Sequence, residues 1–232
     1  MKNFMKKTSL KILSFLAGLS LCSSLDAVIA VSNHHFAAPG GSLVIGKNFG
    51  ENVEWSHSFT TGSNSGGYLL EGMSLKFEFG ATGTPGPMFI EVFEDVAGLP
   101  GDSFAPIDTL SLFSGDPASP GSAFFTGLSS SLDPSTTYWI VVQADVSSSP
   151  DPSHYEWQNV NSLGETDFLG DGWSIGNQSF VKTDISFPNW TDAGGGIATL
   201  EINASPVPEP HVYALLLGGF SLAFVAYRKK LK

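Results

Sequence analysis

Met73-Ser74-Leu75-Lys76-Phe77-Glu78-Phe79 is the stretch that best decides the fold class. Apolar residues occupy its odd positions and polar residues its even positions. A period of two indicates a β-strand with one buried face, because an amphipathic helix repeats every 3.6 residues. Two other stretches, 88–94 and 138–144, are more apolar and are typical of strands covered on both sides. Weaker strand candidates are 53–60, 107–113, 123–126, 155–159, 173–174, 180–185 and 197–202.

Turn-forming residues separate these strand candidates. The chain has 26 Gly and 14 Pro, and only 14% of its residues are charged, which favours many turns over long helices. No repeat of fixed period is present, and residues 31–204 are enough for one core. We therefore expect an all-β fold, an antiparallel β-sandwich of jelly-roll type, as one extracellular domain over 31–204.

Charge is distributed unevenly along the chain. The whole sequence has 11 Lys and Arg against 22 Asp and Glu, a net charge of −11. Between residues 31 and 206, 3 lysines stand against 20 acidic residues, so this region carries −17. Nucleic-acid binding needs clustered Lys and Arg against phosphate, so we expect no nucleic-acid partner.

The N-terminal segment has the three parts of a secretory signal peptide. Four lysines lie within residues 1–11, an apolar stretch follows over 12–22, and Ala27 or Ala30 stands at the cleavage position. We expect residues 1–30 to form a signal helix that is removed on export. The alternative is an uncleaved N-terminal anchor, although the apolar stretch would cover only about half of a bilayer core.

The C-terminal segment also has three parts. A proline-rich spacer over 205–211 contains Val207-Pro208-Glu209-Pro210, residues 212–227 carry no charge, and 228–232 form a basic end with Arg228, Lys229 and Lys230. As a helix, 212–227 would be roughly 24 Å long, a short but possible membrane crossing. We expect a transmembrane helix there, with the basic end in the cytoplasm and the β domain outside. A simple C-terminal anchor is the alternative to a processed tail.

This tail resembles the PEP-CTERM sorting signal of bacteria, which is also called the ice-binding-protein C-terminal motif. The resemblance covers residues 207–232, with Pro208, Glu209 and Pro210 as the motif. It implies an exosortase-type membrane protease as partner, which recognises the tail and cuts near the motif. It also implies a surface or extracellular-matrix protein of an exopolysaccharide-producing Gram-negative bacterium.

A second resemblance spans residues 35–190. It rests on Phe59-Thr60-Thr61-Gly62-Ser63, on Ile90 to Asp95 followed by Leu99-Pro100-Gly101, on Leu132 to Val141, and on Tyr155-Glu156-Trp157. These stretches resemble the choice-of-anchor R domain. That family implies an extracellular all-β domain ahead of a surface-anchoring tail, with no established enzymatic activity.

Two tryptophans are candidate carbohydrate-binding residues. Trp157 and Trp173 flank an acidic loop, and a flat indole can stack on a sugar face while acids accept hydroxyl protons. A carbohydrate-binding module that grips exopolysaccharide is therefore the alternative function. The competing interpretation is that both tryptophans fill a sandwich core, which is their usual environment.

The acidic loop itself is a candidate calcium site. Glu165, Asp167 and Asp171 place hard oxygen ligands on a glycine-rich segment, although the spacing is not that of an EF-hand. The competing interpretation is a solvated acidic loop. Structural calcium is the one cofactor that the sequence suggests.

No catalytic motif stands out in the sequence. Gly41 to Lys47 approaches a phosphate-binding loop, but Asn48 replaces the Ser or Thr that would hold magnesium. Nothing in the sequence specifies a nucleophile together with its general base. A secreted glycoside hydrolase with two carboxylates remains a remote alternative. We therefore expect a non-enzymatic protein, held first in the inner membrane and then exposed at the cell surface or in the matrix.

Overall fold

A computed structural model of the protein describes residues 28–35, 39–83, 86–101, 108–113, 121–145, 150–160, 164–186, 188–194 and 196–229. Residues 1–27 of the predicted signal helix and Lys230 lie outside these residues, whereas 28–30 form the start of strand β1. The described strands are β1 (Val28–Ser32), β2 (Pro39–Asn48), β3 (Glu51–Thr60), β4 (Tyr68–Thr82), β5 (Met88–Val96), β6 (Leu99–Pro100), β7 (Asp108–Phe113), β8 (Gly121–Thr126), β9 (Ser131–Leu132), β10 (Thr137–Ala144), β11 (Ser153–Val160), β12 (Thr166–Asp167), β13 (Ser174–Thr183), β14 (Thr191–Asp192), β15 (Ile197–Ala198) and β16 (Leu200–Pro206). They are followed by the helix α2 (Pro210–Lys229).

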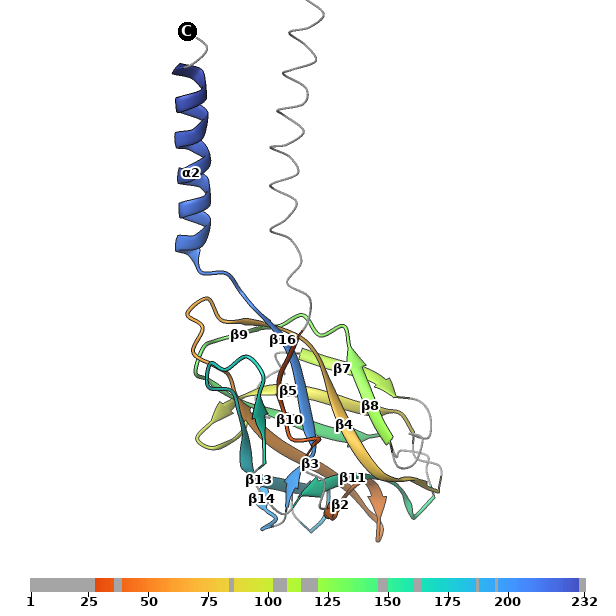
Figure 1. Ribbon diagram of the computed structural model, residues 1–232. Coiled ribbons are helices and arrows are strands. Elements are labelled where there is room, and N and C mark those ends of the chain that lie inside the picture. Colours follow the sequence, from red (N-terminus) through yellow and green to blue (C-terminus); the bar gives the residue numbers. More distant parts are fainter. Residues whose placement is uncertain are drawn as a thin grey trace, which may run out of the picture.

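Strand pairing among the described residues is antiparallel throughout, which confirms the predicted all-β class (Figure 1). The main path of neighbours runs β12-β1-β16-β4-β11-β2-β3-β10-β5-β6. Strands β8 and β9 join β4, β7 joins β5, β15 joins β11, and the β13–β14 pair joins β3.

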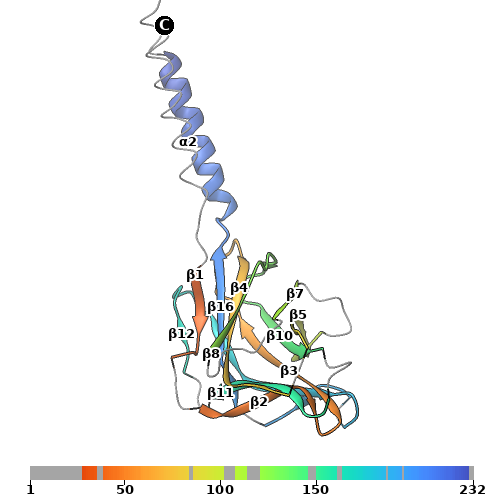
Figure 2. The same cartoon turned by 90° about the vertical axis from the view of Figure 1, so that its right-hand side faces the viewer.

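Two groups of strands face each other across one core. Figure 2 shows β1, β16, β4 and β8 on one side and β3, β10 and β5 on the other. Strand β11 pairs with both β4 and β2, so it links the two groups. Side chains from both groups form one buried cluster, for example Leu75 and Ile202 from the first and Val92 and Ile140 from the second.

The alternating stretch that predicts a strand lies within the long strand β4. Met73, Leu75 and Phe77 are buried there, as the period of two requires. The two short candidates 173–174 and 180–185 overlap a single strand, β13, which contains Ser174 and residues 180–183. The sequence suggests two because a register shift between Ile175 and Ser179 interrupts the pairing with β3.

The β domain extends beyond the predicted 31–204 at both ends. Strand β1 starts at Val28, and Ala30 and Val31 are fully buried. Val28 pairs with Ala204 of β16, which itself continues to Pro206. The first and last strands of the described domain are therefore neighbours.

Helix α2 continues from β16 and projects away from the β domain (Figures 1 and 2). Pro210 opens it, since proline fixes a helical φ and lacks an N–H that the first turn would leave unpaired. Arg228 and Lys229 lie in its last turn, where positive charge interacts favourably with the negative end of the helix dipole. Residues 221–229 are all exposed, among them Leu222 and Phe224.

The predicted transmembrane segment 212–227 is helical as part of α2. Judged on length and hydropathy together, however, none of the helices among the described residues meets the requirements for crossing a membrane.

Candidate functional site

The predicted sorting motif lies where the β domain ends and α2 begins. Val207 donates its N–H to the carbonyl oxygen of Gly67 at 3.0 Å, which extends the β16–β4 ladder by one residue. The Asn64 side-chain amide donates to the Val207 carbonyl oxygen at 3.1 Å. The Ser65 hydroxyl donates to the Glu209 carboxylate. Residues 64–67, which we call the tail clip, thus hold the motif through both backbone and side chain.

Close approach between the tail clip and the motif requires a glycine. A Cβ atom at Gly66 would overlap the Val207 carbonyl oxygen and lie 3.4 Å from the Glu209 nitrogen. Gly67 has a φ of 74°, a left-handed conformation that glycine adopts without strain. The Gly66-Gly67 pair therefore shapes the surface against which the tail lies.

The tail clip is itself attached firmly to the domain. Ser63 donates from its N–H at 2.9 Å and from its hydroxyl at 3.1 Å to the carbonyl oxygen of Asp171. The N–H of Asn64 donates to the Tyr68 hydroxyl at 3.0 Å, and that hydroxyl donates to the Asp171 carboxylate. Burial, together with this bond to Asp171, raises the pKa of Tyr68 to about 12, so the phenol keeps its proton.

The predicted calcium ligands mainly serve the loop in which they lie. Asp167 accepts hydrogen bonds from the N–H groups of Gly170 at 2.8 Å and Gly172 at 2.7 Å. Glu165 accepts from the N–H of Ile175, and Asp171 accepts from Tyr68. Within the described ranges, no group of three or more His, Cys, Asp or Glu side chains is arranged to hold a metal ion. Calcium binding here stays a prediction to which this geometry lends no support.

Trp157 does not form a sugar-binding surface, which corrects the prediction. It points into the core with 0% of its surface exposed, and its Nε1 donates to the carbonyl oxygen of Thr199 at 2.8 Å. The reason is its position on β11, where it shares the inward face with Tyr155.

Trp173 is also buried, with 2% of its surface exposed. Its ring stacks on Phe59 at a centroid distance of 6.1 Å and meets Tyr68 edge-on at 4.8 Å. The predicted carbohydrate site at Trp157 and Trp173 is therefore wrong, because neither ring face is open to a sugar.

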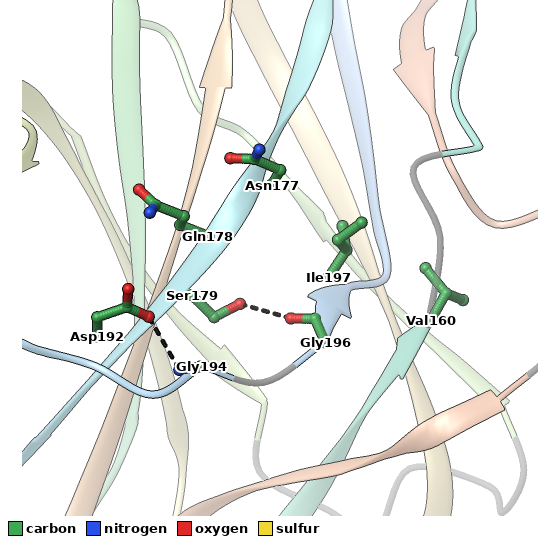
Figure 3. Close-up of a pocket in the computed structure, with 8 residues that line it drawn as sticks. All are labelled: Val160, Asn177, Gln178, Ser179, Asp192, Gly194, Gly196 and Ile197. Atoms are coloured by element: carbon green, nitrogen blue, oxygen red, sulfur yellow. Dashed lines mark hydrogen bonds between the residues drawn. The ribbon is translucent and has the colours of Figure 1, made fainter.

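A polar pocket lies beside β13, where the sequence analysis identifies no site. Its volume is about 290 Å³, and Figure 3 shows it between β13 and the segment leading to β15. Its lining residues are Val160, Asn177, Gln178, Ser179, Asp192, Gly194, Gly196 and Ile197. Asp192 accepts a hydrogen bond from the N–H of Gly194 at 2.9 Å, which fixes one wall. Two side-chain amides, a hydroxyl and a carboxylate thus border one hollow.

A serine–histidine pair lies at the edge of this pocket. The Ser179 hydroxyl is 2.9 Å from Nδ1 of His57 and 3.0 Å from the carbonyl oxygen of Gly196. Burial lowers the pKa of His57 to about 4, so the ring is neutral at pH 7. Ser179 is only 1% exposed, and in the described part of the chain no carboxylate bonds to the other ring nitrogen of His57. The pair therefore lacks the orienting acid and the access typical of a catalytic nucleophile.

Sequence reasoning singles out the Pro-Glu-Pro stretch as a predicted sorting motif, but not the surroundings that the fold gives it. Gly62 to Gly67 reads as an ordinary turn, and only the pairing of β16 with β4 brings the motif against it. The pocket residues come from separate segments that are joined by β13–β14 and β11–β15 pairing, so no local sequence pattern indicates them.

Comparison with known proteins gives little further guidance. No family model matches the chain, and no curated protein matches it. Among solved structures, the fold is similar to the cysteine protease and lectin-like domains of Cwp84, a surface-layer-associated protein of Clostridium difficile, with a TM-score of 0.44 and 13% identity. The match covers 68% of this chain and 32% of that chain, so this chain spans about a third of its length.

Proposed function

We propose that the chain is an exported, non-enzymatic surface or matrix protein, whose C-terminal tail is a sorting signal for an exosortase-type membrane protease. One observation carries the proposal: the Pro-Glu-Pro motif lies at the boundary between a packed β domain and a helix with exposed apolar side chains. Removal of the tail at this boundary would leave every described strand intact, because β16 ends at Pro206.

The two halves of the tail have separate roles in this proposal. Pro208, Glu209 and Pro210 supply the recognised motif. The exposed apolar side chains of α2, with Arg228 and Lys229 at its end, supply the part that a membrane-embedded enzyme engages. The strongly acidic domain stays hydrated outside the cell, since like charge opposes self-association.

The direct test is the intact mass of the protein recovered from the producing cells, with and without membrane extraction. We expect a species that lacks the signal peptide and ends near 208–210. A membrane-extracted species that still carries residues 228–232 as the final product would overturn the processing role. The substitution Glu209→Ala should block tail removal, while Pro188→Ala, in an exposed loop, should leave it unchanged.

A second candidate function is binding of a small hydroxylated ligand, such as one sugar unit of a polysaccharide. It is favoured by the polar pocket, where amide, hydroxyl and carboxylate groups can both donate to and accept from sugar hydroxyls. The pocket lies beside β13 and β14, at the end of the domain away from α2 in Figure 1, so a tail-bound protein would present it outward.

Titration of the folded protein with a panel of sugars, followed by amide NMR shifts, tests this candidate. We expect a bound sugar to shift the amide signals of Asn177, Gln178 and Asp192. Gln178→Ala should weaken the affinity for that sugar at least fivefold, since one hydrogen bond is worth about 1 kcal/mol. Shifts absent from these residues across the panel would reject the pocket as a sugar site. The exposed Gln178 side chain lies at the pocket mouth, so its removal should leave stability unchanged.

A further inference from the structure

We propose that the tail clip is an intramolecular docking site that keeps the sorting motif closed to its processing enzyme until the tail detaches. This inference rests on the proposed function and adds a regulatory contact to it. The clip is residues 64–67, and the docked segment is Val207 to Glu209.

The first step concerns what a peptidase needs. An enzyme that cuts a chain must bind several residues of it in extended form, with their N–H and carbonyl groups available. In this protein the N–H of Val207 donates to the carbonyl oxygen of Gly67. The carbonyl oxygen of Val207 accepts from the side-chain amide of Asn64. The enzyme therefore competes with the clip for the same backbone groups.

The second step concerns the motif's one charged side chain. Glu209 lies against the clip, where the Ser65 hydroxyl donates to its carboxylate. A recognition pocket for Pro-Glu-Pro has to bind this carboxylate, since the neighbouring prolines offer no N–H. Recognition of the docked motif is therefore hindered at the side chain as well as at the backbone.

The third step concerns the cost of opening. The clip is held by Ser63 and by the Tyr68–Asp171 pair, so it does not move away with the tail. The tail must leave instead, and it needs to break only the contacts beyond Pro206, where the β16–β4 ladder ends. Detachment is thus a local event that leaves the core closed.

The chemical step itself is ordinary hydrolysis by the processing enzyme. Water adds across one peptide bond, which leaves a carboxylate on the domain side and an amine on the tail side. The clip takes no part in the hydrolysis. It affects only the fraction of time for which the bond is accessible to the enzyme.

Gly66→Ala is the most selective test of docking. The added methyl overlaps the Val207 carbonyl oxygen, and no unusual backbone conformation at Gly66 is lost. The matched control is Gly219→Ala, which adds the same methyl where nothing lies within 4 Å. Asn64→Ala is the second variant, because it removes the bond to Val207 without adding bulk.

Amide hydrogen exchange on the full-length chain in detergent measures docking directly. Prolines at 206, 208 and 210 carry no N–H, so exchange across 206–210 reports on Val207 and Glu209 alone. We expect a protected Val207 amide in the natural chain and exchange about tenfold faster or more in Gly66→Ala and Asn64→Ala, from the lost hydrogen bonds. An unprotected Val207 amide in the natural chain would overturn the inference.

A pulse-chase measurement of tail removal in the producing cells measures occlusion. We expect faster removal in Gly66→Ala and Asn64→Ala than in the natural chain and in Pro188→Ala, whose exposed position lies outside both the clip and the tail. Equal or slower removal, in a variant whose Val207 amide has lost protection, would refute a closed state. The same comparison with a proline-specific endopeptidase in vitro gives the rate of cutting after Pro208 without the cellular enzyme.

These outcomes separate the two proposals. If the natural chain keeps its tail in cells, the sorting function fails, whereas exchange and in vitro cutting still decide docking and occlusion. If the tail is removed but Val207 is unprotected, the sorting function stands and the closed state is rejected.

Discussion

Trp157 lies at the centre of the core, between the two groups of strands. Its indole meets the ring of His57 edge-on at 6.5 Å, and its Nε1 donates to Thr199. At the residue scale the sequence predicts an aromatic side chain on a strand here, but not whether it faces inward. The inward direction depends on which strands cover β11, and that is set by partners distant in the chain.

We expect Trp157→Ala to lower the free energy of unfolding by about 3–5 kcal/mol, since it empties a fully buried site. Urea unfolding followed by circular dichroism would measure the change. Trp190→Ala is the comparison. Because Trp190 is only partly buried, its substitution should lower the free energy of unfolding by less. Equal losses in the two variants would contradict the burial described for Trp157.

His57 should make the domain sensitive to acid. Its pKa is about 4 in the fold against 6.5 unfolded, so the unfolded chain binds the proton more readily. The contribution of neutral His57 to the free energy of unfolding is fully present above about pH 6.5. It is lost as the pH drops toward 4, by about 3 kcal/mol in total. His34, whose pKa burial lowers to about 4, acts in the same window.

Melting temperatures measured from pH 7.5 to 4.5 should fall for the natural protein and fall less steeply for His57→Gln. Identical slopes in the two proteins would show that His57 does not carry the effect. The comparison uses the slope with pH, which is independent of any constant loss caused by the substitution.

Strand β1 connects the fold with the processing of the N-terminus. Ala30 and Val31 are buried, and the Asn33 side chain donates to the carbonyl oxygen of Ala198 at 2.9 Å and accepts from the N–H of Leu200 at 2.6 Å. A cut after Ala30 would remove three residues of this strand. A cut after Ala27 would leave it whole.

We therefore expect the exported protein to begin at Val28, as N-terminal sequencing would show. A chain starting at Val31 should unfold at a lower temperature, because it loses the pairs Val28↔Ala204 and Ile29↔Asn203. Recovery of a stable natural product that begins at Val31 would contradict this expectation.

At the element scale, prediction from the sequence succeeds where one face is buried. The segment 73–79 alternates cleanly in sequence and lies in β4, where Met73, Leu75 and Phe77 are buried. It fails where burial depends on distant partners. Residues 28–30 read as the end of a leader, yet β16 covers them, and 177–178 read as a break, yet they bulge within β13.

At the scale of the whole molecule, the β domain and α2 are separable. The described members of the main core all lie between Ala30 and Ala204, and α2 begins after the last strand ends. A chain that stops after Glu209 should keep the melting temperature of the full-length protein within a few degrees. It should also self-associate less than the full-length protein, because the exposed apolar side chains of α2 are gone.

Calorimetry and analytical ultracentrifugation of the shortened chain would test both expectations. A large drop in melting temperature would mean that α2 supports the domain. Persistent aggregation would place the adhesive surface elsewhere, for example at Phe49, which is 92% exposed.

The pairing of β1 with β16 also sets an order in time. A chain that crosses a membrane from its N-terminus delivers β1 early, but β1 pairs with β12 only when residues near 166 emerge and with β16 only when residues near 204 emerge. Contacts this distant in sequence form slowly, and until they form the backbone groups along one edge of β1 stay unpaired. Strand β16 is then the last strand to pair, and α2 follows it directly along the chain. In the export that we propose, the tail therefore arrives only after the whole domain ahead of it has been delivered.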